Sequence, residues 1–187
     1  MSKNILILTG SPRKGGNSDL LAEAFIAGAQ QSGHTTVKYV TAAKDIKGCK
    51  ACKTCFSKGI ACSFPDDFNE LAPFLEQADM VVFATPLYWF SFPVQLKAAI
   101  DKFYSFLIGK RTLKIKECVL LVCGVAEDEA EYEGIVKSYE LIADYQKWID
   151  RGILIVPGVN EKGDILKTEG LLRAENLGKS MLSGETA

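Results

Sequence analysis

Residues 5–18 carry the sequence Ile-Leu-Ile-Leu-Thr-Gly-Ser-Pro-Arg-Lys-Gly-Gly-Asn-Ser, and this stretch decides the class of fold. The aliphatic run Ile5–Leu8 is apolar at every position, which predicts a strand buried on both faces. A turn containing Gly10 and Pro12 ends this strand. Asn17 or Ser18 is then placed to cap a helix. A buried strand, a glycine-rich turn and a helix in this order predict the opening of an α/β fold.

The same alternation continues along the chain. Further strands are expected at 35–40, 80–84, 118–123 and 152–156. Helices are expected from 17 or 18 onward, after a capping-box-like start at 67–70, from about 93 to 107, over 132–142 and over 171–181. This order predicts a doubly wound α/β sandwich with a five-stranded parallel sheet and helices on both faces. No repeat or linker divides the sequence, so residues 1–187 are expected to form one domain with a cysteine-rich segment at 48–67.

Composition excludes several classes of protein. The 22 basic and 23 acidic residues give a net charge of −1, so no overall field attracts nucleic acid or an anionic membrane. The longest apolar runs, such as Cys118–Cys123, are far shorter than the roughly 20 residues that span a bilayer. The first residues carry no export signal, which predicts a cytoplasmic protein with reduced cysteines.

The carboxyl ends of the predicted strands are the place to look for a ligand site, because α/β sheets bind ligands there. Glycines in the first loop allow close backbone approach, Arg13 and Lys14 are cationic, and the following helix presents free N–H groups. These features suit a phosphate group. The loop lacks the Gly-Lys-Ser/Thr of a Walker loop and the glycine spacing of a dinucleotide fingerprint. A plain glycine-rich turn before a capped helix is the alternative.

Three motifs together resemble the NADPH-dependent FMN reductase family of flavodoxin-like proteins. The first is Gly-Ser-Pro-Arg-x-x-Gly-Asn-Ser at 10–18, and the second is Thr-Pro-Leu-Tyr-Trp at 85–89. The third combines Gln-Leu-Lys at 95–97 with Ile-Asp-Lys-Phe at 100–103. The resemblance implies a flavodoxin-like fold with strand order 2-1-3-4-5, bound FMN, and assembly into homodimers or homotetramers.

The resemblance also implies which residues contact FMN. Four residues of the first loop would hold its phosphate: Ser11, Arg13, Asn17 and Ser18. The loop after the third strand would run beside the ribityl chain and the isoalloxazine ring through Pro86, Leu87, Tyr88, Trp89 and Phe90. The loop that begins at Gly124 would also touch the flavin. The alternative for the aromatic loop at 86–90 is that its side chains form a subunit interface or part of the core.

The reaction that follows from this resemblance needs no catalytic side chain. Hydride transfer from NAD(P)H to FMN is the chemistry of the two cofactors, and the protein supplies binding and orientation. His34, the only histidine, is expected to be a solvated turn residue. We therefore expect an FMN-dependent NAD(P)H oxidoreductase that reduces a quinone, a flavin or another small acceptor.

Four cysteines with the spacing Cys49-x2-Cys52-x2-Cys55-x6-Cys62 form a separate motif. Four thiolates so close in sequence can ligate a [4Fe–4S] cluster or a zinc ion. The spacing resembles that of iron–sulfur flavoproteins, so an electron carrier with FMN and a [4Fe–4S] cluster is the alternative function. A zinc-stabilised binding module is the second alternative, and a reduced loop without metal is also open. Cys118 and Cys123 are expected in the core.

Overall fold

Five strands form one sheet in the computed structural model, which describes residues 1–181. The strands are β1 (Asn4–Thr9), β2 (Thr35–Val40), β3 (Met80–Pro86), β4 (Glu117–Cys123) and β5 (Ile149–Val156). Their order is β2-β1-β3-β4-β5 and every neighbouring pair is parallel. The strand order and the parallel sheet predicted from sequence are therefore confirmed.

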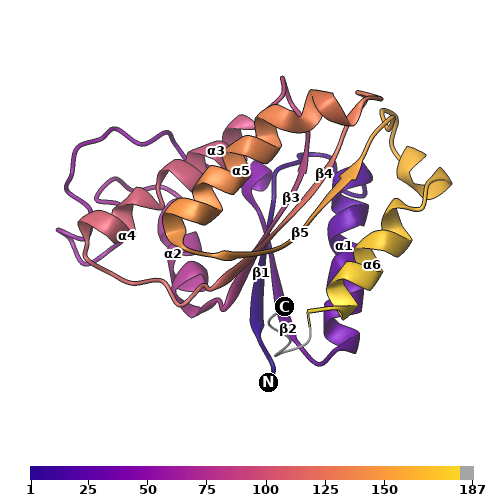
Figure 1. Cartoon of the computed structure of the whole chain (residues 1–187). Helices are drawn as coiled ribbons and strands as arrows, with labels where there is room; N and C mark the ends of the chain where they lie inside the picture. The colour runs from indigo at the N-terminus through magenta and orange to yellow at the C-terminus, as the bar shows by residue number, and fades with distance from the viewer. Residues whose placement is uncertain (182–187) are drawn as a thin grey trace.

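Helices cover both faces of the sheet (Figure 1). One face carries α1 (Asn17–Gln31) and α6 (Gly170–Lys179), and the other carries α2 (Phe68–Gln77), α3 (Val94–Asp101), α4 (Tyr104–Ile108) and α5 (Glu133–Gln146). Short 3-10 turns occur at η1 (Thr41–Ala43), η2 (Glu129–Tyr132) and η3 (Asp164–Lys167). The layers form the three-layer sandwich expected from the alternating pattern.

Side chains of the central strands alternate between two cores. Ile5 and Ile7 of β1 pack on the α1 and α6 side, whereas Leu6 and Leu8 pack on the α2 to α5 side. Glycine permits the close approach of α1 and α6, because a Cβ on Gly28 would lie 2.0 Å from the carbonyl oxygen of Glu175. The sheet is thus buried on both faces, which leaves its carboxyl edge as the natural place for a ligand.

Two element boundaries differ from the sequence-based expectation. The helix expected from 93 to 107 is divided into α3 and α4, and the buried Lys102 lies at the junction. Strand β5 begins at Ile149 instead of Gly152, and an irregularity in its register with β4 follows Cys118. Gly152 was expected to start the strand but lies inside it. Its φ of 145° is a conformation that glycine adopts readily, so the strand continues through this position.

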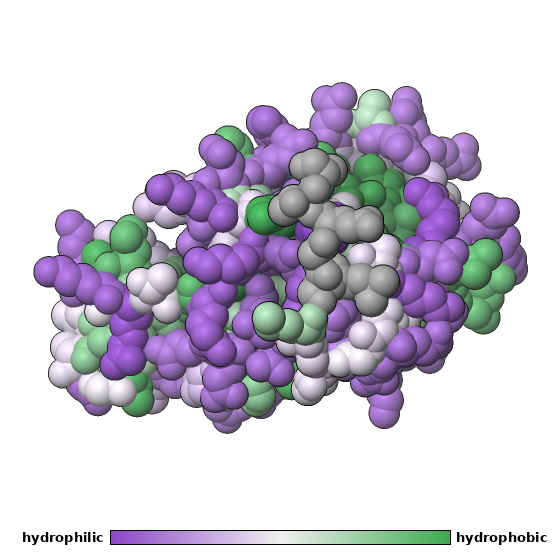
Figure 2. Space-filling view, turned by 60° about the horizontal axis from the view of Figure 1, so that its bottom comes forward, coloured by the Kyte–Doolittle hydropathy of each residue, from purple (hydrophilic) through white to green (hydrophobic). Residues whose placement is uncertain are grey.

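Figure 2 shows the side of the molecule that lies at the bottom of Figure 1, where the strands begin. Hydrophilic residues dominate this face, and hydrophobic residues gather in separate patches. Within residues 1–181, none of the helices combines the length and the apolar character needed to cross a bilayer.

Candidate functional site

The first predicted ligand loop joins β1 to α1 and begins the candidate site. Helix α1 starts at Asn17, with Gly16 as its N-cap residue, so neither Asn17 nor Ser18 caps it as expected. Glycine has no side chain to accept the N–H groups of the first turn, and no side-chain cap bond is formed there. The amino end of α1 therefore offers its N–H groups to an anion.

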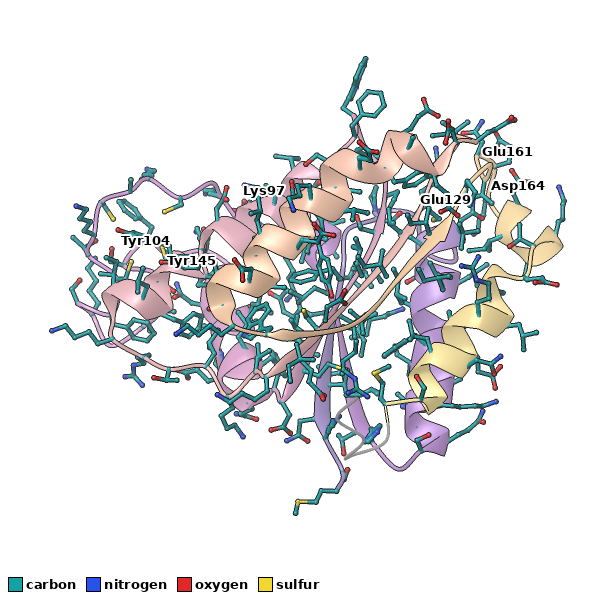
Figure 3. The ribbon with its side chains drawn as sticks, in the orientation of Figure 1. Lys97, Tyr104, Glu129, Tyr145, Glu161 and Asp164 are labelled. Atoms are coloured by element: carbon teal, nitrogen blue, oxygen red, sulfur yellow. The ribbon has the colours of Figure 1, made fainter. Side chains whose placement is uncertain are left out.

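Asn17 connects this loop to the distant β5–α6 connection instead of capping α1. Its Oδ1 accepts the main-chain N–H groups of Gly163 at 3.0 Å and Ile165 at 3.3 Å, and its Nδ2 donates to the carbonyl oxygen of Glu161 at 3.0 Å. One of the two amide hydrogens of Asn17 is used by the carbonyl oxygen of Glu161. Figure 3 shows Glu161 on this connection, at the end of the sheet where β5 finishes.

The other predicted phosphate residues divide into buried and exposed groups. Ser11 and Ser18 are buried, and the Oγ of Ser11 accepts the main-chain N–H of Arg13 at 3.1 Å. Arg13 is exposed, and its guanidinium donates to the carbonyl oxygen of Asn160 at 3.4 Å. The β5–α6 connection also contributes a cation that sequence analysis missed, because the Nζ of Lys162 lies 3.5 Å from the position of a Cβ on Gly15.

Thr9, the last residue of β1, supplies the test of whether a phosphate fits beside this loop. Its side chain is buried and its Oγ1 has no hydrogen-bond partner, a property shared by one other side-chain atom among residues 1–181. Buried hydroxyls are nearly always hydrogen-bonded. An unpaired donor at the strand end, the uncapped α1 and the two cations Arg13 and Lys162 together have the chemistry that a flavin phosphate requires.

A carboxylate close to the loop is neutralised by its partners. Asp19 accepts the N–H of Gly15 at 2.7 Å and forms an ion pair with Lys38 at 2.9 Å. Burial raises the pKa of Asp19, but the bonds from Lys38 and Gly15 outweigh burial, so its pKa lies below the usual value. Asp19 therefore stays ionised and paired, and it shapes the loop without repelling an anion as a free carboxylate would.

The second predicted ligand loop follows β3 and forms a tight aromatic turn. Tyr88 and Ser91 exchange main-chain hydrogen bonds of 3.1 and 3.0 Å. The two central residues, Trp89 and Phe90, have φ of 45° and 62°, which bulky residues rarely adopt. Trp89 is 93% exposed at the tip. Such strained turns are retained where their position serves a function.

Close contacts between glycines and neighbouring loops bring three strand ends together. A Cβ on Gly10 would lie 2.7 Å from the Oγ1 of Thr85, so the first loop abuts the end of β3. A Cβ on Gly124 would lie 3.1 Å from the Cβ of Leu87. Leu87 also donates its N–H to the carbonyl oxygen of Cys123 at 2.8 Å. The predicted contact residues of β1, β3 and β4 thus lie along one edge.

The cysteine-rich segment lies between η1 and α2 in the chain, and its cavity shares no lining residue with the loops after β1, β3 and β4. All four cysteines of the motif line one cavity of about 170 Å³, with walls formed by 47–53, Cys55, 62–66, Lys102, Tyr104 and Ser105. Four of these residues are lysines and Asp66 is the only carboxylate, so the charge of the lining is positive: Lys47, Lys50, Lys53 and Lys102. Such a lining suits thiolates or a negatively charged occupant.

Two of the four thiols differ in acidity. Burial, and after it the neighbouring Cys52, raises the pKa of Cys55. The exposed Cys52 has a lowered pKa, chiefly because the Oγ1 of Thr54 lies 3.1 Å from its sulfur. In the part of the chain that the structure describes, no three cysteine, histidine or carboxylate side chains are arranged to hold a metal ion.

Side chains outside the cysteine motif fix its loop in place. Asn69 accepts the N–H of Cys62 at 2.8 Å and donates to the carbonyl oxygen of Cys62 at 3.1 Å. Asp67 accepts the N–H of Asp45 at 2.8 Å. Asp67 therefore joins the two ends of the cysteine-rich loop. The expected capping bond from Asp67 to the first turn of α2 is not formed. Lys102 and Asp66 form an ion pair with exposed side-chain fractions of 4% and 1%.

Three other expectations about single residues are tested by burial. Cys118 and Cys123 lie in the core as expected, and burial raises their pKa values to about 11 and about 12. The expectation that His34 is solvated is wrong, since it is 7% exposed. Its Nδ1 accepts the N–H of Lys3 at 3.2 Å, and its Nε2 lies 2.9 Å from the carbonyl oxygen of Met181. Contacts between distant segments bury this histidine.

A larger groove of about 900 Å³ lies between α4 and α5, away from the predicted loops. Figure 3 labels Tyr104 of α4 and Tyr145 of α5, which both line it. Its lining also includes the apolar Leu107 and Leu141, both of which are more than half exposed. Sequence analysis did not identify this groove, because it is formed by helix faces that no motif marks.

Comparisons with known proteins agree with this architecture. The sequence model of the NADPH-dependent FMN reductase family matches residues 3–132. An iron–sulfur flavoprotein of Archaeoglobus fulgidus is 32% identical over 181 residues, which cover 93% of this chain and 76% of the relative. A Bacillus subtilis protein provisionally named an NAD(P)H-dependent FMN-containing oxidoreductase is 25% identical over 91% of this chain and 93% of its own length.

A solved structure has the same fold. The NAD(P)H:quinone oxidoreductase from Methanothermobacter marburgensis superposes with a TM-score of 0.79 at 22% identity, with all of both chains covered. At this identity the likeness establishes the arrangement of strands and helices.

Proposed function

The chain belongs to the NADPH-dependent FMN reductase family, and from this premise we propose that it is an FMN-dependent NAD(P)H oxidoreductase. The observation that carries the proposal is the meeting of the β1, β3 and β4 loops beside the uncapped amino end of α1. The substrates would be NAD(P)H and a small two-electron acceptor such as a quinone or a flavin. Overall, NAD(P)H gives a hydride, and the acceptor takes up its two electrons and its proton together with a second proton from solvent.

In this proposal the first loop holds the FMN phosphate. The N–H groups at the start of α1 and the hydroxyls of Ser11 and Ser18 donate to the phosphate oxygens. Arg13 supplies positive charge, and Asn17 positions the loop while its remaining amide hydrogen faces the ligand. Lys162 adds a second cation from the β5–α6 connection.

The loop after β3 would line the ring of the flavin. Pro86, Leu87 and Tyr88 leave the sheet beside Gly124, and the turn at Trp89 and Phe90 projects beyond them. Bound FMN would supply the redox-active ring that receives the hydride of NAD(P)H. The chain binds and orients the reactants, and no side chain is assigned the role of acid, base or nucleophile.

The phosphate site is tested by comparing FMN with riboflavin, which has the same ring and lacks the phosphate. We expect FMN to bind at least tenfold more tightly, because one charge-assisted hydrogen bond contributes about 1.5–3 kcal/mol. Lys162→Met should weaken FMN binding and leave riboflavin binding unchanged. Equal affinities of the wild type for the two flavins, measured by fluorescence quenching, would refute the assignment.

A second candidate function is that of an iron–sulfur flavoprotein, an electron carrier with FMN and a [4Fe–4S] cluster. The specific observation in its favour is that Cys49, Cys52, Cys55 and Cys62 line one positively lined cavity. Four thiolates are the ligand set that such a cluster takes. A single zinc ion requires its sulfur ligands to lie about 3.8 Å apart, because Zn–S bonds of about 2.3 Å point to the corners of a tetrahedron. The described residues contain no three side chains arranged in this way, so the zinc-stabilised module is not favoured.

Iron and sulfide analysis of anaerobically reconstituted protein distinguishes these two candidates. The electron carrier requires about four irons and four sulfides per chain and their loss in Cys52→Ser. Protein that binds FMN but takes up neither iron nor sulfide is a reductase without a cluster. Cys123→Ser is the matched control, since that thiol is buried in the core on the far side of the sheet from α3 and α4.

Assembly and location belong to the same proposal. We propose a homodimer or homotetramer, supported by the exposed aromatic turn at Trp89 and by the apolar groove between α4 and α5. A cytoplasmic location is supported by the six cysteines, all of which are free. Light scattering of the purified protein measures the assembly directly.

A further inference from the structure

Lys38 lies on β2, a strand at the edge of the sheet, outside the ligand loops and outside every motif of the sequence. Two carboxylates of α1 hold its ammonium: the Oδ1 of Asp19 lies 2.9 Å from its Nζ, and Glu23 forms a second ion pair. The side chains of Lys38 and Asp19 are 24% and 14% exposed, so solvent screens this pair only in part. Burial lowers the pKa of Lys38, but the bonds from Asp19 and Glu23 outweigh burial, so its pKa lies above the ordinary value. Lys38 is therefore a fixed cation beside the first turn of α1.

The second oxygen of Asp19 connects this ion pair to the first ligand loop. It is the Oδ2, which accepts the main-chain N–H of Gly15 at 2.7 Å. Gly15 has φ 65°, a left-handed conformation that glycine adopts readily. The Nζ of Lys162 lies 3.5 Å from the position of a Cβ on Gly15. One carboxylate thus joins Lys38 to the loop residue beside which a cation of the proposed phosphate site lies.

The charge of Asp19 has two opposite effects at the amino end of α1. A carboxylate in the first turn stabilises the helix, because it faces the positive end of the helix dipole. The same negative charge opposes a phosphate that binds at that helix end. Glu23, one turn further along α1, adds a second negative charge, and Lys38 cancels one of the two. Without Lys38, both carboxylates would face the phosphate site uncompensated by this cation.

We propose that Lys38 is a positioning residue of the phosphate site: it holds Asp19 where its carboxylate fixes Gly15, and it cancels a charge that would otherwise repel the FMN phosphate. The proposal rests on the FMN-dependent function proposed above. Its basis is the continuous chain of contacts from Lys38 through Asp19 to Gly15. Because the effect is directed at the phosphate, it distinguishes FMN from riboflavin, whereas an ion pair with a merely structural role affects both flavins equally.

Four variants separate the two roles. Lys38→Met removes the cation, and Lys38→Arg keeps it. The double variant Lys38→Met with Asp19→Asn removes the carboxylate as well, and keeps an amide oxygen that can accept the N–H of Gly15. Lys3→Met is the matched control, because the pair of Lys3 and Glu117 is also partly buried, at 15% and 14% exposure, and lies at the opposite end of the sheet, where the strands begin. Lys38→Gln, with a neutral amide donor, replaces Lys38→Met if that variant does not fold.

The closing experiment measures the dissociation constants of FMN and riboflavin for the wild type and each variant by fluorescence quenching. We expect Lys38→Met to weaken FMN binding about tenfold and to leave riboflavin binding unchanged, since only FMN carries the charge that Asp19 opposes. Lys38→Arg, the double variant and Lys3→Met should keep most of the wild-type preference for FMN.

Three results overturn the role of Lys38 and leave the proposed function intact, provided that the wild type prefers FMN. They are an unchanged FMN affinity in Lys38→Met, equal losses for the two flavins in that variant, and a double variant that binds FMN no better than Lys38→Met. A wild type that binds no FMN supplied in excess overturns both proposals.

Discussion

The side-chain oxygen of Asn17 accepts the main-chain N–H of Gly163 at 3.0 Å, a contact between residues 146 positions apart. It holds the β5–α6 connection against the first loop, so the proposed phosphate site is assembled from both ends of the chain. The same contact brings Lys162 beside Gly15. In the proposed phosphate site, Asn17 would act on the ligand both through its own amide and through the segment that it positions.

Replacing Asn17 with alanine should damage both stability and flavin binding. The variant loses three hydrogen bonds and leaves the N–H groups of Gly163 and Ile165 without their acceptor, so we expect a loss of about 1–3 kcal/mol in unfolding free energy. FMN affinity should fall at least tenfold. Urea unfolding and flavin fluorescence measure the two effects. Asn176→Ala on α6 is the control, and equal FMN affinity in the two variants would refute the positioning role.

The aromatic turn should be more stable with the residues that its geometry favours. Asn-Gly is the preferred pair where both central residues have positive φ, so Trp89→Asn with Phe90→Gly should raise the unfolding free energy by about 1–2 kcal/mol. Trp89 is almost fully exposed, so little packing is lost. We expect weaker FMN binding at the same time. A variant that is more stable and binds FMN as well as the wild type would show that the strain serves no purpose at this site.

Several features of the fold and site were predictable from local sequence. The apolar runs gave the five strands, and the loops at 10–18 and 86–90 follow the strands that the pattern predicted. Contacts between distant segments were not predictable. Nothing near Asn17 indicates its bond to Gly163, and nothing near His34 indicates its contact with the carbonyl oxygen of Met181. Lys102 lies off the apolar stripe of Leu96, Ile100, Phe103 and Leu107, so nothing local indicates the break between α3 and α4.

The buried ion pair between Lys102 and Asp66 should be required for stability. Lys102→Met leaves the Asp66 carboxylate buried without its cation, and we expect a loss of about 3–5 kcal/mol in unfolding free energy. The double variant with Asp66→Asn should recover part of that loss, because no uncompensated charge remains. Urea unfolding of the wild type, of Lys102→Met, of Asp66→Asn and of the double variant gives the coupling free energy between the two residues. Additive losses would mean that the pair does not act as a unit.

The Asp19–Lys38 pair should make stability depend on pH in the acid range. The folded-state pKa of Asp19 lies below its ordinary value of 3.8, so the stability that its ionised form contributes is present above that pH. It is lost as pH falls through the lower folded-state pKa. The wild type should therefore exceed Asp19→Asn in stability at pH 7, and the difference should shrink below about pH 4. A difference that is constant across this range would contradict the linkage.

The visible absorption spectrum of anaerobically purified protein, recorded before and after addition of NADPH, tests the central claim most directly. A flavin site built from the loops after β1, β3 and β4 predicts one FMN per chain, recovered by adding FMN if purification removes it. NADPH or NADH should then bleach the flavin bands. Protein that binds no FMN when the cofactor is supplied in excess, or whose bound flavin neither nucleotide reduces, would contradict the assignment of this chain as an FMN-dependent NAD(P)H oxidoreductase.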